Sequence, residues 1–391
     1  MRADPTLAAR NLRIWNDFSR TLVAGFKAHA LVLAIAAIYF LLMALTIWTR
    51  PDAITVPFFA VVGSIFQISV LLTLIAIVLQ RFYHMVIHAK PERPGMYFMA
   101  DLAARLFDPR RWATGFPMGV AMLAFMYVYA IFKYNIPLIA PFSWDQTFEV
   151  WGRMLHFGLH PWQWLAPLLG NPTVTSLLCA NYVLWGALLW GTTVALGFSG
   201  KNNVLRTRFF LTFMLTWSIG GSLLAIAFSS AGPCFWQSLN LPGNPYGGVM
   251  ENLHASNNVF TRAVLLTQDT LWQGYSNHAL IAGISAMPSM HNATALLLAL
   301  TGLHFGRVIA ITMWTHCILV FIGSIWLGWH YAVDGYVAFA LTGLFWRVSL
   351  PAARWWHSLD FVKDFDRVLE ELPALDSAPT AKPTTQQPVA A

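Results

Sequence analysis

The chain has 391 residues, of which 57% are hydrophobic, 15% aromatic and only 10% charged. A globular domain surrounded by water carries about 25% charged residues, so this composition excludes an ordinary soluble fold and indicates a membrane protein. The formal net charge of +7 would suit a nucleic-acid-binding protein, but the Lys and Arg residues lie in short segments between apolar runs. That placement is typical of membrane topology, so we expect a membrane environment and no nucleic acid.

The cysteines and the N-terminal segment exclude two further classes. Cys179, Cys234 and Cys317 have no Cys-x-x-Cys spacing, which argues against a disulfide scaffold and a thiolate zinc site. The first apolar run starts near Ala30, after a basic leader, and is long enough to span a bilayer by itself. We therefore expect no cleavable signal peptide and a first helix that stays attached.

Apolar runs fill most of the chain between residues 29 and 350. A transmembrane helix needs about 20 predominantly apolar residues. Eight runs meet this requirement and predict eight transmembrane helices at 30–48, 54–79, 117–140, 174–198, 209–230, 288–306, 308–327 and 331–349. The sequence therefore predicts an all-α, polytopic integral membrane helical bundle with both termini on the same side.

The spacing of these runs divides the chain into four parts. Residues 1–28 are a basic N-terminal segment, and residues 29–116 contain two extra transmembrane helices and a loop. Residues 117–350 contain the other six spans, which are expected to form the core domain. Residues 351–391 form a tail that is expected to be partly disordered, because from residue 372 it is Ala, Pro, Thr and Gln without aromatic residues.

The basic residues indicate how the bundle is oriented. Lys and Arg accumulate on the cytoplasmic side of membrane proteins. If the N-terminus is inside, nearly all of the 24 Lys and Arg residues fall inside, and the outer segments contain only Arg50, Arg153 and Arg262. This predicts that both termini are cytoplasmic, and that two Trp-rich segments, 141–173 and 231–287, cap the extracytoplasmic face.

Two short segments at the predicted outer surface contain the residues best suited to chemistry. In the first, residues 286–293, Pro288 suits the first turn of a helix. Ser289 and the free backbone N–H groups there can donate hydrogen bonds to an anion, and His291 is expected to point to the same place. This end of the helix is thus a candidate anion-binding site.

The second segment, residues 328–335, contains His330 and Asp334 four residues apart, on one face of a helix. The carboxylate can fix the imidazole tautomer and stabilise its cation, which makes the histidine a good nucleophile. The two segments together suit phosphoryl transfer, in which one histidine attacks phosphorus and a second protonates the leaving oxygen. Donors at the helix end would hold the phosphate oxygens.

These Pro-Ser-Met-His and His-Tyr-Ala-Val-Asp segments resemble the second and third signature motifs of the type 2 phosphatidic acid phosphatase superfamily, in the family's order. That family is an integral membrane helical bundle whose members cleave or transfer lipid phosphate groups through a phosphohistidine, normally without a metal. The resemblance covers residues 117–350 and implies that His330 is the nucleophile, Asp334 its orienting partner and His291 the general acid. It implies no metal and no cofactor. The residues that it implies for substrate binding are Ser289, Pro288 and Tyr331.

The sequence departs from the family's pattern at two phosphate-binding arginines. The family's first motif contains a Lys and an Arg-Pro pair, and its place is taken here by residues 229–233, Ser-Ser-Ala-Gly-Pro. The third motif usually begins Ser-Arg, and those positions are Gly323 and Ser324. Loss of both arginines is similar to the branch that contains inositol phosphorylceramide synthase, a sphingolipid enzyme that transfers a phosphorylated headgroup between lipids.

The scarcity of outer cations points the same way. A phosphate monoester dianion calls for Arg or Lys ligands, whereas a phosphodiester carries less charge and needs fewer. We therefore expect an inositolphosphotransferase-like enzyme with a lipid phosphate substrate and a hydroxyl-bearing lipid acceptor. The alternative is a lipid phosphate or prenyl diphosphate phosphatase. Lys133, near the outer end of its span, can supply a replacement charge or reach to the lipid headgroups, and the sequence favours the second role.

A different class of function also stays open. The missing arginines allow a transporter or a non-catalytic protein that retains the fold. A haem-binding cytochrome is disfavoured, because His291 and His330 lie at helix ends and axial ligands usually face each other within a bundle core.

Overall fold

The computed structural model describes residues 19–372, apart from residues 51, 54, 56, 257 and 278–282. The described part of the chain is helical and contains no strand, which confirms the all-α prediction. The predicted disordered tail lies outside the described residues, except for Leu372. The first described residues, 19–28, are helical and lead into the bundle.

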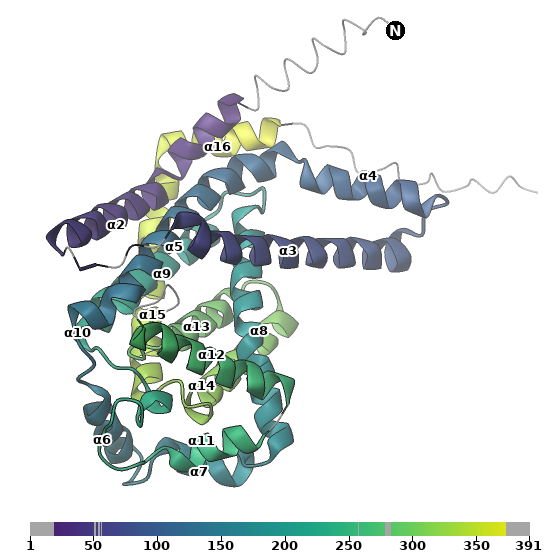
Figure 1. Cartoon of the computed structure of the whole chain (residues 1–391). Coiled ribbons are helices and arrows are strands. Elements are labelled where there is room, and N and C mark those ends of the chain that lie inside the picture. Colours follow the sequence, from purple (N-terminus) through teal and green to yellow (C-terminus); the bar gives the residue numbers. More distant parts are fainter. Residues whose placement is uncertain are drawn as a thin grey trace, which may run out of the picture.

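Long helices make up the body of the molecule (Figure 1). Seven helices in the described part are long and apolar enough to cross a membrane. They correspond to seven of the eight predicted spans and confirm an integral membrane bundle. The elements that contain them are α2 (Ala30–Thr49), α3 (Phe58–His84) with η1 (Met85–Ala89), α5 (Pro109–Ile139), α8 (Pro172–Gly197), α9 (Val204–Leu215) with η2 (Thr216–Leu224) and α10 (Ala225–Ala227), α14 (Arg307–Trp326) and α15 (Ala332–Ser358).

The remaining predicted span, 288–306, forms the shorter helix α13 (Met290–Gly302). Its 13 residues rise about 20 Å, which is less than the roughly 30 Å of a bilayer's hydrocarbon core. α13 packs against α8, α9, α14 and α15, and small residues on it, such as Ala293 and Ala295, are fully buried. α13 is therefore a central helix of the bundle rather than one of its long spans.

Short helices cover the two ends of the bundle. Those from the two predicted outer segments include α6 (Asp145–Leu155), α7 (Pro161–Leu169) and α11 (Gly247–Ala255), which lie together at one end (Figure 1). At the opposite end lies α16 (Asp360–Glu371), whose Phe365 and Leu369 pack against Ala28 and Ala113. The 27 residues of α15 connect these ends over about 40 Å. The other short elements are α4 (Pro94–Leu106), η3 (Pro233–Phe235) and α12 (Val259–Ser276).

A buried arginine joins three helices at the α16 end. Arg206 is 1% exposed and donates to the carbonyls of Leu196 and Gly197, which end α8, and to Thr114 O in α5. Its Nη1 also meets the His29 ring at the start of α2. The sequence places Arg206 among the basic residues of the cytoplasmic side. In the structure its side chain is buried and links α2, α5 and α8.

Candidate active site

The two predicted motifs meet at the end of the bundle covered by α6, α7 and α11. His330 lies in the turn between α14 and α15, and its backbone N–H donates to Ser324 O at 3.0 Å. Its Nδ1 lies 2.9 Å from the carbonyl oxygen of Ala286, just before the other motif. Because a carbonyl oxygen only accepts, Nδ1 carries the proton and a neutral ring keeps its lone pair on Nε2. The sequence did not predict this partner.

Asp334 lies beside the His330 ring and also binds the backbone of Tyr331. Its Oδ2 is 3.4 Å from His330 Nδ1 and accepts a 2.9 Å hydrogen bond from the backbone N–H of Tyr331. That bond caps the start of α15. Asp334 is fully buried, and its Oδ1 has no hydrogen-bond partner among the described residues. The predicted pairing of His330 with Asp334 is present, with Ala286 O as the closer partner of Nδ1.

His291 lies on the first turn of α13, facing His330. The centroids of the two imidazole rings are 5.9 Å apart. Two aromatic rings from α8 hold His291: Tyr182 stacks on it at 4.6 Å between centroids, and Trp185 lies at 4.1 Å. Neither residue was predicted from the sequence, because both lie in an apolar run.

Ser289 is the N-cap of α13. Its Oγ accepts hydrogen bonds from the backbone N–H of Asn292 at 3.3 Å and from the Asn292 side chain at 3.1 Å. Asn292 Nδ2 also donates to Ser324 Oγ at 3.1 Å, and all three residues are fully buried. Because Ser289 takes the cap position, Pro288 precedes the helix, so its predicted place in the first turn is wrong. The serine hydroxyl here orders the start of α13.

Asp145, which was not predicted as a site residue, binds the backbone of residues 229–233, where the sequence lacks the charged residues of the family's first motif. Its carboxylate accepts from the backbone N–H groups of Ala231, at 3.0 Å, and Gly232, at 2.8 Å. It also accepts from the Tyr331 hydroxyl at 2.8 Å. Burial raises the pKa of Asp145, although the hydrogen bonds from Gly232, Ala231 and Tyr331 act to lower it. Tyr331, which was predicted to bind substrate, is buried, and its hydroxyl donates to Asp145.

The segment around Gly232 bonds to the start of the first motif and packs closely against the second. Ser230 O accepts from the backbone N–H of Ala286 at 2.9 Å, and Ser230 Oγ accepts from Met287 N–H at 3.2 Å. Gly232 has φ +108°, and a Cβ there would lie 2.6 Å from Trp329 O. Three segments far apart in the sequence, 229–233, 286–291 and 328–334, therefore form one site.

The profile of the PAP2 superfamily matches residues 146–348, just over half of the chain. The chain belongs to the PAP2 superfamily. No curated protein and no solved structure matches it. Membership makes it an integral membrane enzyme of the phosphatase and phosphotransferase class, and the matched range contains the two histidines and Asp334.

The positions at which this PAP2 superfamily chain lacks arginines are accounted for by other contacts. Ser324 Oγ donates to Phe321 O at 2.8 Å and accepts from Asn292, so this position is filled by a buried network. The Nζ atom of Lys133 donates to Ser285 O, at 3.1 Å, in the loop before α13. The expectation that Lys133 reaches to the lipid headgroups is therefore wrong, because its ammonium points at the loop before α13.

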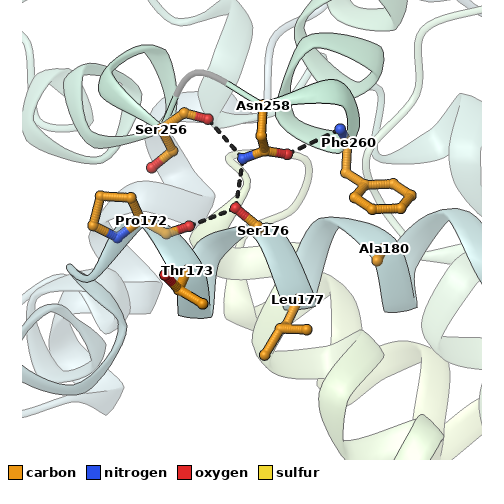
Figure 2. Close-up of a pocket in the computed structure, with 8 residues that line it drawn as sticks. All are labelled: Pro172, Thr173, Ser176, Leu177, Ala180, Ser256, Asn258 and Phe260. Carbon is orange, nitrogen blue, oxygen red and sulfur yellow. Dashed lines mark hydrogen bonds between the residues drawn. The ribbon is translucent and has the colours of Figure 1, made fainter.

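Two hollows lie near the end helices. A small one beside His330 is walled by aromatic rings, among them Phe148, Trp162 and Tyr246. A larger one, of about 280 Å³, lies between the start of α8 and the start of α12 (Figure 2). Its lining includes no histidine, carboxylate or cation, and Asn258 and Ser176 there bond to each other and to nearby carbonyls. Of these two hollows, the one at His330 is lined by residues of a predicted motif, namely His330, Tyr331 and Ala332.

Potential metal ligands are not clustered in the described part of the chain. No three His, Cys, Asp or Glu side chains there gather closely enough to hold a metal ion. The titratable groups of the site are His330, His291, Asp334 and Asp145, with Lys133 beside them. The arrangement can therefore supply a nucleophile, a proton donor and one positive charge.

Proposed function

We propose that the protein is a phosphotransferase that acts on lipid phosphate headgroups through a phosphohistidine at His330. The observation that carries the proposal is the hydrogen bond from His330 Nδ1 to Ala286 O. It holds the neutral ring with its Nε2 lone pair free to attack, and His291 faces it at 5.9 Å between ring centroids.

The reaction has two balanced steps. In the first, the Nε2 lone pair of His330 forms a bond to phosphorus, the bond from phosphorus to the leaving oxygen breaks, and His291 gives that oxygen a proton. In the second, His291 takes the proton of an acceptor hydroxyl, whose oxygen attacks phosphorus and displaces His330. Asp334, at 3.4 Å from Nδ1, stabilises the positive charge that the ring carries between the steps.

The specific version that we propose is an inositolphosphotransferase-like exchange between two lipids. The site contains two buried carboxylates, Asp145 and Asp334, and the Asp145 carboxylate already occupies the N–H groups of Ala231 and Gly232. A singly charged phosphodiester suits such a site better than a monoester dianion does.

We also propose that the site faces the extracytoplasmic side and that both termini are cytoplasmic. The distribution of basic residues supports this orientation. α16, with its exposed Lys363 and Arg367, lies at the end of the bundle opposite to α6, α7 and α11 (Figure 1). The lipid substrate would therefore reach His330 from the outer leaflet.

Product analysis tests the function directly. Purified protein is incubated with phosphatidylinositol, ceramide and diacylglycerol, or separately with phosphatidic acid, and the lipids and water-soluble products are identified by mass spectrometry. A new inositolphosphoryl lipid that depends on His330 is the expected result, and His330→Ala is the control. Inorganic phosphate from phosphatidic acid alone would favour the phosphatase instead. Absence of any product that depends on His330 would favour a non-catalytic protein.

A further inference from the structure

The cations at the site end of the bundle have different surroundings. Arg50 donates to Leu138 O at 3.0 Å, at the end of α5. Arg153 pairs with Glu149 at 2.8 Å on α6, and Arg262 is exposed on α12. Lys133 is directed at the loop before α13, next to the Ala286 carbonyl that binds His330, which makes it the cation to consider for a role with substrate.

Lys133 is held over that segment from two sides. Its Nζ donates to Ser285 O, one residue before the Ala286 carbonyl that binds His330. Gly283, with φ +123°, packs on the lysine stem so closely that a Cβ there would lie 3.1 Å from Lys133 Cγ. The ammonium is thus held at Ser285 O, one residue before the carbonyl that binds His330.

We propose that Lys133 is the cationic ligand of the phosphoryl group at this site and acts in place of the two missing arginines. The proposal rests on the phosphotransfer function above. An ammonium has three N–H donors, and Ser285 O takes one, so the others can bind non-bridging phosphate oxygens. A single lysine is a point charge rather than a two-pronged clamp, which matches a substrate with one negative charge.

Lys133 also positions the chain through its bond to Ser285 O, so the variants are chosen to separate this contact from the effect of the positive charge. Lys133→Met removes charge and donor, Lys133→Gln keeps a donor without charge, and Lys133→Arg keeps the charge. Arg50→Met is the matched control, since it removes a cation at the same end whose partner is Leu138 O. Size-exclusion profiles and thermal unfolding in detergent establish that each full-length variant is folded.

The probe is orthovanadate, which forms five-coordinate species that resemble phosphorus during transfer. Its binding to the purified chain is followed by tryptophan fluorescence, because Trp185 lies against His291. We expect Lys133→Met and Lys133→Gln to weaken vanadate binding about 10- to 100-fold, the range for a charge-assisted hydrogen bond. Lys133→Arg is expected to stay within about threefold of wild type, and Arg50→Met to be unchanged.

Several outcomes would overturn the proposal. Wild-type affinity in folded Lys133→Met would remove Lys133 from the site, and recovery by Lys133→Gln would assign it a positioning role only. Failure of the wild type to bind vanadate would overturn it as well. If the lysine variants lose vanadate while wild type makes no lipid product, Lys133 remains the anion ligand and the proposed reaction fails. If His330-dependent transfer persists in Lys133→Met, the lysine proposal alone fails.

Discussion

The hydroxyl of Tyr331 donates a 2.8 Å hydrogen bond to the carboxylate of Asp145, 186 residues earlier in the chain. The same carboxylate binds the backbone of Ala231 and Gly232. One side chain therefore joins the residue next to His330 to the segment at 229–233. The position of His330 relative to that segment depends on this junction.

Replacement of Asp145 by Ala is expected to impair both stability and turnover. It leaves two buried N–H groups and one hydroxyl without their acceptor, at about 1–3 kcal/mol for each unsatisfied group. Thermal unfolding and kcat/KM for the lipid substrate measure the two effects. Tyr331→Phe removes one of the three bonds and is expected to show a smaller loss.

Asp364→Asn is the control for Asp145, because Asp364 is an exposed residue of α16 far from the site. Asp145→Asn keeps one acceptor oxygen and is expected to fall between Asp145→Ala and wild type. An unfolding temperature and kcat/KM equal to wild type in Asp145→Ala would refute the role assigned to this carboxylate.

His291→Ala is expected to separate the two halves of the reaction. Without the proton donor, kcat with a lipid alkoxide leaving group should fall about 100-fold or more, whereas a nitrophenyl phosphodiester, whose leaving group needs no proton, should still phosphorylate His330. Intact-mass spectrometry after an alkaline quench, which preserves phosphohistidine, measures the adduct.

The matched control for His291 is His254→Ala, since His254 lies on the exposed side of α11 and bonds only its own helix at Met250 O. Equal losses of adduct from both substrates in His291→Ala would mean that His291 shapes the site and does not donate the proton.

Asp334→Asn is expected to lower kcat about 10- to 100-fold without abolishing turnover. The carbonyl of Ala286 remains the closest partner of His330 Nδ1 and keeps the tautomer, whereas the stabilisation of the imidazolium is lost. Steady-state kinetics measure the loss, with the exposed Asp360→Asn as control. A complete loss in folded protein would show that Ala286 O alone does not orient the ring.

Arg206→Met is expected to destabilise the protein and spare the chemistry. The substitution removes a buried donor from the carbonyls of Leu196, Gly197 and Thr114, at about 1–3 kcal/mol for each carbonyl that has no other donor. Arg206 lies toward the α16 end, so kcat of the folded fraction should not change. Arg367→Met, at an exposed ion pair with Asp364, controls for loss of positive charge. An unchanged unfolding temperature would contradict the structural role of Arg206.

Local patterns in the sequence predicted the long helices and the two motifs. Apolar runs of sufficient length define most spans, and the spacing of His330 and Asp334 places them on one helical face. The length of α13 was overestimated, because the apolar run at 288–306 includes the cap residue Ser289 and the turn after Gly302. An apolar run does not show where a capping side chain starts the helix.

Local sequence patterns did not predict the contacts that complete the site. Lys133 meets Ser285, Asp145 meets Tyr331, and Tyr182 meets His291 across more than 100 residues each. Such pairings depend on how helices pack, which neither hydropathy nor motif spacing specifies. Lys133 illustrates this limit, since a lysine near a span end ordinarily extends to the headgroups and here turns inward.

The segment at 229–233 is held mainly by its main chain. Asp145 binds the N–H groups of Ala231 and Gly232, and Ser230 O binds Ala286 N–H. Residues 229–231 are buried and Ser230 Oγ also accepts from Met287 N–H, so we expect this segment to keep small side chains and its main-chain path. Gly232 is the most restricted position, because Trp329 O leaves no room for a side chain. Distant relatives that share this architecture should be found by a glycine at this position and a carboxylate facing it, rather than by the charged residues of the family's first motif.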